Sequence, residues 1–412
     1  MNNYIAHTDE VRQDMLASIG LDSVDELFKQ IPIRYNDFKM ENPLSELETQ
    51  KKVKSIAKKN KTEYISFLGG GVYNKFIPAA VNYVAQRFEF LTAYTPYQPE
   101  ISQGTLQIIY EYQTMISRIT GMDIANASMY DGGSACAEAV LMAHRIARGK
   151  LNKAYISNKL NPDYKEVIKT YSWAQGIEVE WFDEQPEDVS DGCCVLVQYP
   201  DYYGEIEKLV KPDTIFIVCA NLSALSVIKP PTEADIVVGD IQPLGIPVNF
   251  GGPHAGFMAC KEQYMRQMPG RLVGRTLDAD GEQAFTLTIQ TREQHIKREK
   301  ATSNICSNQS LIALSATLYL SLVGEKGFKE TGIICANNAH QLSEKLAKKG
   351  IKTVNKVFYN EFVIEVPDAD SFLKKLKEAN ILGGIKLDDK KILVCATEMN
   401  TSEDIEAYIE AV

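Results

Sequence analysis

The apolar and polar positions of the chain change period several times between residues 104 and 325, and each change predicts an element of secondary structure. Short runs rich in β-branched and aromatic residues alternate with stretches of helical periodicity, which is typical of a mostly parallel sheet with helices on both faces. The predicted strands are residues 154–157, 178–182, 194–198, 214–219, 236–239 and 256–260, and a helix is predicted at 162–175. The central part of the chain is therefore predicted to be an α/β domain.

The first eighty residues follow a different pattern, in which polar side chains dominate and the periodicity is helical. Thr8 is a candidate helix N-cap. Ser23 and Glu26 have the spacing of a capping box, in which a hydroxyl and a carboxylate satisfy free backbone N–H groups reciprocally. An apolar stripe also runs through this segment, at Leu16, Ile19 and Leu27. Two interpretations stay open: an extension that completes its own core, or a helical arm that lies on the main domain or on another subunit.

The pattern changes again after residue 332. A lysine-rich helix is followed by alternating β-rich and helical runs, and the predicted elements are a helix at 336–349, strands at 362–366 and 392–395, and a helix at 370–379. This is typical of a small α+β domain. The chain is therefore predicted to have three parts: a helical N-terminal arm (1–80), a large domain (81–328) and a small C-terminal domain (329–412).

Composition narrows the class of protein. With 412 residues and 45% hydrophobic content, the chain can bury a sizeable core. A net charge of −10 leaves no broad basic surface to neutralise phosphates, so nucleic acid is not an expected partner. No basic leader is followed by an apolar run, and no apolar run approaches the ~20 residues of a membrane-spanning helix. The eight cysteines are scattered without a C-x-x-C pair and most lie in apolar stretches, which predicts reduced thiols and a cytoplasmic location.

Two segments before residue 140 carry candidate chemistry. Residues 92–104 (TAYTPYQPEISQG) contain prolines that stiffen a loop, so the tyrosines are either fixed walls of a polar pocket or part of a rigid surface connection. Residues 130–139 (YDGGSACAEA) form a glycine turn that opens an alanine-rich helix. The free N–H groups at such a helix end suit a phosphate or a carboxylate, and tight packing of the helix on the sheet explains the glycines equally well.

Two later segments are also candidates. Gln242 is followed by residues 249–254 (NFGGPH), where the glycines permit close approach of the backbone to a ligand or another subunit, or simply form a turn. Residues 291–310 contain a basic cluster that runs into Thr302, Ser303 and Asn304 before an apolar helix. That arrangement suits an anion, although a charged helix face followed by an N-cap gives the same pattern. The sequence offers no metal-ligand spacing, Walker loop or nucleophile elbow.

Together these segments resemble the glycine decarboxylase P-protein of the glycine cleavage system, in particular the N-terminal-half subunit of its two-chain form. The matching strings are residues 15–20 (MLASIG), 25–28 (DELF), 94–100 (YTPYQPE), 292–296 (REQHI) and 300–306 (KATSNIC). The resemblance covers nearly the whole chain, and the later strings are long and unusual in composition. It implies an α/β fold of the fold-type I class, the aminotransferase-like architecture of enzymes that use pyridoxal 5'-phosphate (PLP).

The sequence departs from the PLP-bearing half of that family at two positions. In that half a lysine stands four residues before an Ile-Pro pair, and here the corresponding residue is Gln242, which cannot form an imine. An aspartate that faces the pyridine nitrogen is replaced by Val218, and without the carboxylate the ring loses the partner that keeps it protonated. The resemblance therefore implies that PLP is bound by a partner subunit and not covalently by this chain.

The resemblance implies a subunit of glycine dehydrogenase (decarboxylating) that pairs with a homologous, PLP-bearing subunit 2, as an α2β2 assembly. The complex is expected to bind glycine through PLP, release CO2 and transfer the aminomethyl group to the lipoyl group of H-protein, without nucleic acid or membrane. The residues predicted to reach the PLP phosphate of the partner are Thr302, Ser303 and Asn304. Those predicted to shape the interface or substrate channel are Tyr94, Tyr97, Gln98, Glu100 and Ser102. No metal site is predicted, and no residue is assigned to catalysis.

Other classes of function stay open. The chain is alternatively a non-catalytic scaffold that stabilises its partner without contributing active-site residues. A stand-alone PLP enzyme with another lysine is disfavoured because no lysine follows the strand at 236–239 before Lys261. A dinucleotide-binding enzyme is disfavoured because no predicted strand is followed by a Gly-x-Gly-x-x-Gly string.

Overall fold

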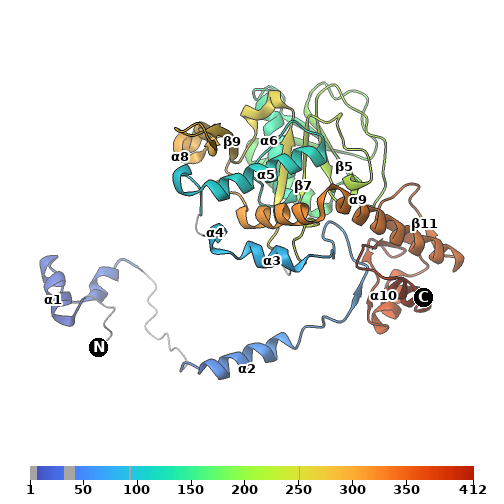
Figure 1. Ribbon diagram of the computed structural model, residues 1–412, viewed down its shortest axis with the longest axis horizontal. Helices are drawn as coiled ribbons and strands as arrows, with labels where there is room; N and C mark the ends of the chain where they lie inside the picture. The colour runs from blue at the N-terminus through green and yellow to red at the C-terminus, as the bar shows by residue number, and fades with distance from the viewer. Residues whose placement is uncertain (1–6, 32–41, 92–93, 250) are drawn as a thin grey trace. The chain divides into compact units, whose positions relative to one another are not determined.

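The computed structural model describes residues 7–31, 42–91, 94–249 and 251–412 (Figure 1). The chain separates into two compact units, Met1–Thr62 and Glu63–Val412. The predicted division into three parts stays a prediction.

The first unit contains α1 (Asp9–Ser18), a 3₁₀ turn η1 (Val24–Phe28) and α2 (Glu46–Ala57). The predicted N-cap is confirmed, because the Thr8 hydroxyl accepts a hydrogen bond from a backbone N–H of α1. The predicted capping box at Ser23 is wrong. The Ser23 side chain caps nothing, and the Glu26 carboxylate accepts instead from Lys29 (3.1 Å). A capping box that was not predicted begins α2.

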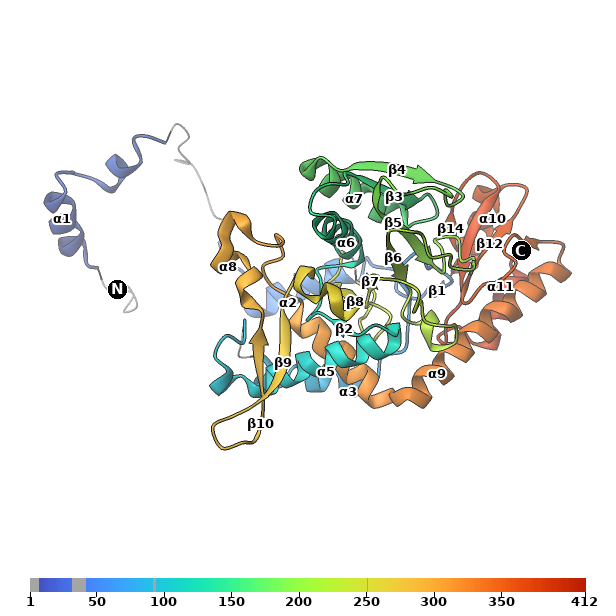
Figure 2. The same cartoon turned by 90° about the horizontal axis from the view of Figure 1, so that it is seen from above.

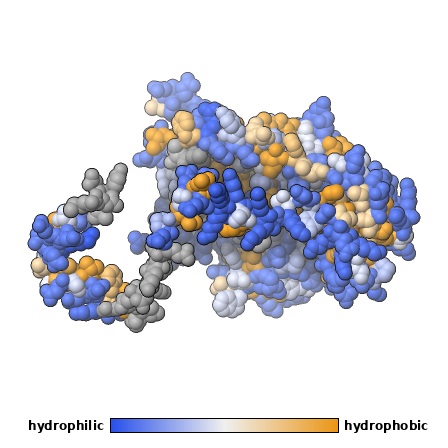
Figure 3. Space-filling model, turned by 90° about the horizontal axis from the view of Figure 1, so that it is seen from below, coloured by the Kyte–Doolittle hydropathy of each residue, from blue (hydrophilic) through white to orange (hydrophobic). Residues whose placement is uncertain are grey.

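The first unit buries little apolar surface of its own. Of the predicted stripe, Leu16 is buried, whereas Ile19 and Leu27 are 58% and 45% exposed. Figure 3 shows apolar side chains at the surface of this unit in orange. The large apolar residues exposed in it are Val11, Met15, Ile19, Val24, Leu27, Phe28, Ile31, Leu44, Leu47, Val53 and Ile56. A segment with so little core of its own is expected to need a covering surface.

The second unit is built on a seven-stranded sheet in the order β2-β8-β7-β6-β5-β3-β4. The strands are β2 (Ile124–Ala125), β3 (Lys153–Ser157), β4 (Glu178–Phe182), β5 (Gly192–Tyr199), β6 (Ile215–Ala220), β7 (Ile236–Asp240) and β8 (Gly256–Cys260). The run from β7 to β4 is parallel, and β8 and β2 are antiparallel to their neighbours. The mostly parallel sheet is confirmed, and all six predicted strands lie within two residues of the observed ones.

Helices cover both faces of this sheet (Figures 1 and 2). One face packs against α6 (Gly132–Ile146) and α7 (Pro162–Gln175). The other packs against α3 (Ala79–Ala85), α5 (Gln103–Thr120) and the first part of α9. Because both faces are buried, the strands read as continuous apolar runs rather than as alternating ones.

Helix α9 (Ser310–Lys348) is longer than predicted and contains the expected helix at 336–349 as its last part. It bends at Gly324, whose backbone is not helical (φ 62°, ψ −179°). By length and composition alone it could cross a membrane, and it is the one such helix within the described ranges. Ala313 and Ala316 pack in the core beside the sheet, and Leu342 and Leu346 pack in the small domain. Core packing therefore accounts for much of its apolar content.

A second, smaller sheet follows the bend in α9, in the part of the chain predicted to be the small domain. This antiparallel sheet has the order β11-β12-β15-β14, formed by Lys352–Thr353, Glu361–Glu365, Lys391–Cys395 and Ile385–Lys386. Helices α10 (Ala369–Glu378) and α11 (Ser402–Glu410) pack against it. A short strand from a much earlier part of the chain, β1 (Ile65–Ser66), pairs in parallel with β13 (Ile381–Leu382). The predicted α+β character of residues 329–412 matches these elements.

One hairpin was not predicted. Strands β9 (Leu272–Leu277) and β10 (Gln283–Thr288) pair antiparallel and pack against α5 through Val273, Phe285 and Leu287. The remaining short helical elements are α4 (Phe88–Leu91), η2 (Pro99–Ile101), η3 (Ala224–Ser226), η4 (Glu262–Gln267), η5 (Gln290–Arg292), α8 (Gln294–Lys297) and η6 (Arg298–Lys300). The hairpin matters for the site because it begins directly after Arg271.

Candidate functional site

Residues 298–309, which lie within the predicted anion-binding segment 291–310, form a loop that is held by hydrogen bonds to distant residues. Apart from one 3₁₀ turn it has no regular structure before α9 begins. The backbone N–H of Thr302 donates to the carbonyl of Arg292 (3.0 Å), and the N–H of Cys306 donates to the hydroxyl of Tyr130 (2.9 Å). The predicted segments at 130–139 and 291–310 therefore meet at this loop.

Two of the three residues predicted for phosphate binding lie in one place. Thr302 and Ser303 line a small cavity together with Arg292 and Glu293. Asn304 is exposed and lies outside this lining. The structure thus brings two hydroxyl side chains beside a guanidinium group and a carboxylate, around a cavity of about 10 Å³.

The tyrosine-rich segment reaches the same region through Tyr97. Its ring lies edge-on to the His295 ring, with the centroids 5.5 Å apart, and the Arg271 guanidinium lies 5.6 Å from the Tyr97 ring centre. Thr92 and Ala93 of this segment lie outside the described residues, as does Phe250 of the glycine segment.

The other predicted residues of the tyrosine-rich segment behave differently from Tyr97. Ser102 is buried directly before α5. Those that lie exposed are Tyr94, Gln98 and Glu100. Tyr94 is 82% exposed, which fits a surface that another molecule covers better than it fits packing against the body.

Buried charges lie around the loop, and the sequence interpretation missed most of them. Glu138 on α6 is 1% exposed, and burial raises the pKa of its carboxyl. Burial also lowers the pKa values of the Arg145 and Arg292 guanidinium groups. With Arg271 and Glu293 the cluster holds three guanidinium groups and two carboxylates. The side-chain atoms that are buried there without a hydrogen-bond partner in the described part of the chain are Glu138 Oε2, Arg145 Nε, Arg271 Nε and Glu293 Oε1.

Gln242 lies after β7 and is completely buried. Its Oε1 accepts a hydrogen bond from the backbone N–H of Tyr73 (2.8 Å), and its Nε2 donates to the carbonyls of Tyr73 (2.9 Å) and Ile246 (2.9 Å). The carboxamide is therefore saturated by backbone groups from two segments. A side chain held in this way is a structural lock rather than a reactive group.

The helix end that was predicted to suit an anion is filled by the chain's own carboxylates. Asp131 caps α6 by accepting from the N–H of Ser134 (2.7 Å), and Asp240 accepts from the N–H of Gly132 (3.1 Å). Asp240 also lies 3.2 Å from His254 Nδ1, and this contact raises the pKa of the imidazole. Two negative charges thus occupy the positive end of the helix.

The cavity beside these residues is small, about 40 Å³. It is lined by residues at the carboxyl ends of β6 and β7, including Cys219 and Asp240. Val218 packs instead in the fully buried apolar core between the sheet and the helices. A volume of this size holds a few water molecules.

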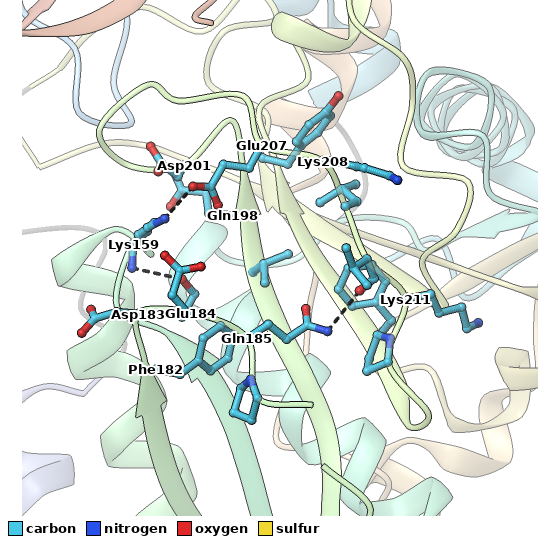
Figure 4. Close-up of a pocket in the computed structure, with 18 of the residues that line it drawn as sticks. Lys159, Phe182, Asp183, Glu184, Gln185, Gln198, Asp201, Glu207, Lys208 and Lys211 are labelled. Carbon is cyan, nitrogen blue, oxygen red and sulfur yellow. Dashed lines mark hydrogen bonds and ion pairs between the residues drawn. The ribbon is translucent and has the colours of Figure 1, made fainter. Parts of the chain in front are cut away.

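A larger cavity, of about 450 Å³, opens at the carboxyl ends of β3, β4 and β5 (Figure 4). At its lining the Lys159 Nζ pairs with Glu207 (2.6 Å), and Gln185 donates to the carbonyl of Val210 (3.2 Å). Among the described residues that line it there is none of the predicted site residues, so it is separate from the predicted site. Nor do the described ranges contain a group of three or more histidine, cysteine and acidic side chains that could hold a metal ion.

Comparison with known proteins assigns the chain to a family. The model of the glycine cleavage system P-protein matches residues 2–412. The chain belongs to this family. A probable glycine dehydrogenase (decarboxylating) subunit 1 from Geobacillus thermodenitrificans is 45% identical, over 99% of this chain and 98% of its own length. One of the same name from Dictyoglomus turgidum is 45% identical over the same shares.

Solved structures agree with the family and the fold. A glycine decarboxylase (P-protein) of the glycine cleavage system, in inhibitor-bound form, is 38% identical and has a TM-score of 0.89 over 99% of each chain. A glutamate decarboxylase from Lactobacillus brevis is 12% identical with a TM-score of 0.65, over 95% of this chain and 96% of its own, and so shares the fold alone. The predicted fold-type I architecture is confirmed.

PLP, the cofactor of this fold class, does not fit the position at which this P-protein chain would hold it. Gln242, at the position where the resemblance predicts the lysine, is saturated by backbone groups, the helix end is occupied by Asp131 and Asp240, and the cavity beside them is about 40 Å³. A phosphate placed at that helix end would meet two carboxylates, which repel it.

Two residues of this P-protein chain that position the site were not found from sequence. Arg271 contacts two of the converging segments, 92–104 and 291–310. Gln103 ties the tyrosine-rich segment to β10 by exchanging hydrogen bonds with the backbone of Phe285 (2.8 and 2.9 Å). Arg271 lies in no motif. Gln103 lies near the end of the predicted segment 92–104, but no role was assigned to it.

Proposed function

We propose that the chain is the subunit of a two-chain glycine decarboxylase that carries no cofactor of its own and acts with a homologous PLP-bearing subunit. The observation that carries this proposal is that the chain's own cofactor position is filled. Gln242 stands where the lysine would be, and Asp131 and Asp240 accept the hydrogen bonds of the helix end that would hold the phosphate. The names of the curated relatives, which are called subunit 1, support a partner subunit.

The complete enzyme is proposed to bind glycine through the partner's PLP, release CO2 and pass the aminomethyl group to the lipoyl group of H-protein, as an α2β2 assembly. The cofactor supplies the electron sink for decarboxylation when it is bound by the partner. This chain's own contribution is to bind and orient.

Thr302 and Ser303 are proposed to reach the phosphate of the partner's PLP, with Asn304 at the exposed end of the same loop. Their support is the cavity they share with Arg292 and the excess of guanidinium groups over carboxylates around it. Charge-assisted hydrogen bonds from such groups hold phosphates well.

The partner subunit is proposed to cover an apolar surface formed by α3, α4 and the segment that precedes α5 in the chain. The large apolar side chains exposed on α3, on α4 and in the segment before α5 are Tyr83, Phe88, Tyr94, Tyr97 and Ile101. Exposed groups of this kind mark interaction surfaces in soluble proteins. The interface or the substrate channel is then shaped by Tyr94, Tyr97, Gln98, Glu100 and Ser102.

A cytoplasmic location is proposed as well, since seven of the eight cysteines are buried free thiols.

The test is reconstitution. The chain, the PLP-bearing subunit and the mixture are each assayed for PLP absorbance and for exchange of bicarbonate with glycine. We expect no PLP colour from the chain alone and exchange only from the mixture. Full activity of the isolated partner would favour the scaffold alternative. PLP colour in this chain alone, fixed to a lysine by borohydride, would overturn the proposal.

A further inference from the structure

Arg271 lies at the point where the segments of the candidate site converge. Its side chain is 3% exposed, although it carries a permanent charge. Nη2 donates to the carbonyl of Cys306 (2.9 Å), and Nη1 donates to Oδ1 of Asn308 (3.2 Å). Two arms of one guanidinium group therefore hold two points of the loop of residues 298–309.

The backbone of Arg271 and the loop of residues 298–309 are both hydrogen-bonded to the same residue, Ala127. The Arg271 carbonyl accepts from the N–H of Ala127 (2.9 Å), and the Asn308 amide group donates to the carbonyl of Ala127 (3.1 Å). Arg271 is thus fixed at its main chain by the residue to which the loop is also tied. This closed arrangement leaves the guanidinium little freedom to follow the loop if the loop moves.

The other side of the Arg271 side chain faces Glu293 and Tyr97. Its Nε lies 3.8 Å from the Glu293 carboxylate, and its guanidinium lies over the Tyr97 ring. The 3.8 Å separation from Glu293 Oε2 exceeds hydrogen-bond length, which agrees with the unpartnered Arg271 Nε. The fork toward Cys306 and Asn308 is therefore the closer and better satisfied of its contacts.

We infer that Arg271 is the positioning residue of this site: its forked donors hold the loop that presents Thr302 and Ser303. What the loop binds rests on the proposed function, whereas the way in which Arg271 holds the loop does not. A loop fixed by side-chain hydrogen bonds rather than by regular structure opens locally when those bonds are lost. A lysine does not replace the fork, because an ammonium group has no planar pair of donors.

The first experiment uses the full chain alone. Amide hydrogen exchange is measured at Cys306 and Gln309, whose N–H groups donate to Tyr130 and Ser128. In both Arg271→Lys and Arg271→Met we expect exchange at these amides to rise by about tenfold or more, the effect of losing hydrogen bonds to a charged group. Amides of β7 should not change. If Arg271→Met does not fold, Arg271→Lys keeps the charge and carries the test.

The matched control is Arg275, an exposed arginine on β9 four residues further along the chain. Arg275→Lys and Arg275→Met should leave exchange in the loop unchanged. Equal exchange in the Arg271 and Arg275 variants overturns the inference.

The second experiment uses the reconstituted complex and separates positioning from a general loss of structure. In Arg271→Lys the PLP concentration for half-maximal activity should rise about tenfold, with kcat at saturating PLP within about twofold of wild type. A loss of kcat that excess PLP does not restore overturns the positioning role. Faster loop exchange with an unchanged requirement for PLP upholds the role of Arg271 in holding the loop and refutes the proposed contact of the loop with the cofactor.

Discussion

Gln242 and Tyr73 pair through a complete amide: the carboxamide oxygen accepts from the backbone N–H of Tyr73 at 2.8 Å, and the carboxamide nitrogen donates back to the carbonyl of the same residue at 2.9 Å. The two residues are 169 positions apart in the chain. The Gln242 side chain thus makes with Tyr73 the pair of hydrogen bonds that a neighbouring strand would make, although Tyr73 lies in no strand. In this chain the Gln242 side chain binds backbone, at the position where the resemblance predicts a lysine in the PLP-bearing half.

Replacing this glutamine by lysine is expected to damage the fold without creating a cofactor site. In Gln242→Lys the paired amide contacts are lost and an amine enters a fully buried position, which should lower the free energy of unfolding by about 3 kcal/mol. Urea unfolding measures the loss. Absorbance after incubation with PLP should show no bound cofactor, because Asp131 and Asp240 still fill the helix end.

Gln175→Lys is the control, since Gln175 ends α7 and is exposed. It should unfold at the wild-type urea concentration. A Gln242→Lys protein of wild-type stability that gains borohydride-reducible PLP would show that the site is intact apart from its lysine.

The double variant Thr302→Ala/Ser303→Ala tests the loop directly in the assembled complex. We expect weaker retention of PLP because two hydroxyl donors beside Arg292 are removed, and two hydrogen bonds to a phosphate correspond to roughly a tenfold to hundredfold loss of affinity. The measurement is the rate of cofactor loss during dialysis, compared with Ser55→Ala on the exposed face of α2. Unchanged cofactor occupancy and turnover would remove these two residues from the site.

The absence of a lysine at position 242 stays a prediction from the resemblance, since Gln242 lies in a string that keeps the Ile-Pro pair and glycines. The bonding of Gln242 to Tyr73 could not be predicted, because nothing local to residue 73 indicates a partner so far along the chain. Arg271 shows the same limit. Arg271 and Arg275 both lie in the run RLVGR, and the first is buried against the loop of residues 298–309, distant in the chain, whereas the second is exposed. Continuous apolar strands were found readily because burial on both faces gives a local signal.

Gly332 in α9 provides a test of how tightly this helix packs against Ser226 and Val227. A methyl group added at Gly332 would collide with the hydroxyl of Ser226 and lie 3.0 Å from Val227. Alanine normally favours a helix over glycine by about 1 kcal/mol, but overpacking costs about 1 to 3 kcal/mol, so Gly332→Ala should be net destabilising. Thermal unfolding of Gly332→Ala, with and without Ser226→Ala, measures the collision.

Gly327 in the same helix is the matched control. A methyl group there would approach only Val323, at 3.2 Å, so Gly327→Ala should be neutral or stabilising. If both glycine variants stabilise the protein, α9 does not pack against residues 224–226 as closely as described.

Glu361 gives the protein a pH dependence of stability whose sign can be worked out. Its carboxylate is buried on β12 and accepts from the Tyr73 hydroxyl (2.6 Å) and the Gly70 N–H (2.6 Å), and burial raises its pKa from 4.5 to about 7. The folded chain therefore keeps a proton that the unfolded chain releases. Stability is full below the unfolded pKa of 4.5 and falls as pH rises to about 7, by at most about 3 kcal/mol.

Urea unfolding between pH 5 and pH 8 measures this slope in the wild type and in Glu361→Gln, which does not titrate. Asp201, whose pKa burial raises to about 6, and His254, whose pKa Asp240 raises, contribute in the same direction. Glu361→Gln should therefore reduce the slope without abolishing it. Because Tyr73 also pairs with Gln242, the pH at which Glu361 loses its proton should be the pH at which the segment holding the glutamine begins to loosen. A wild-type stability that rises over this range, or an equal slope in both proteins, would contradict a protonated Glu361 in the folded chain.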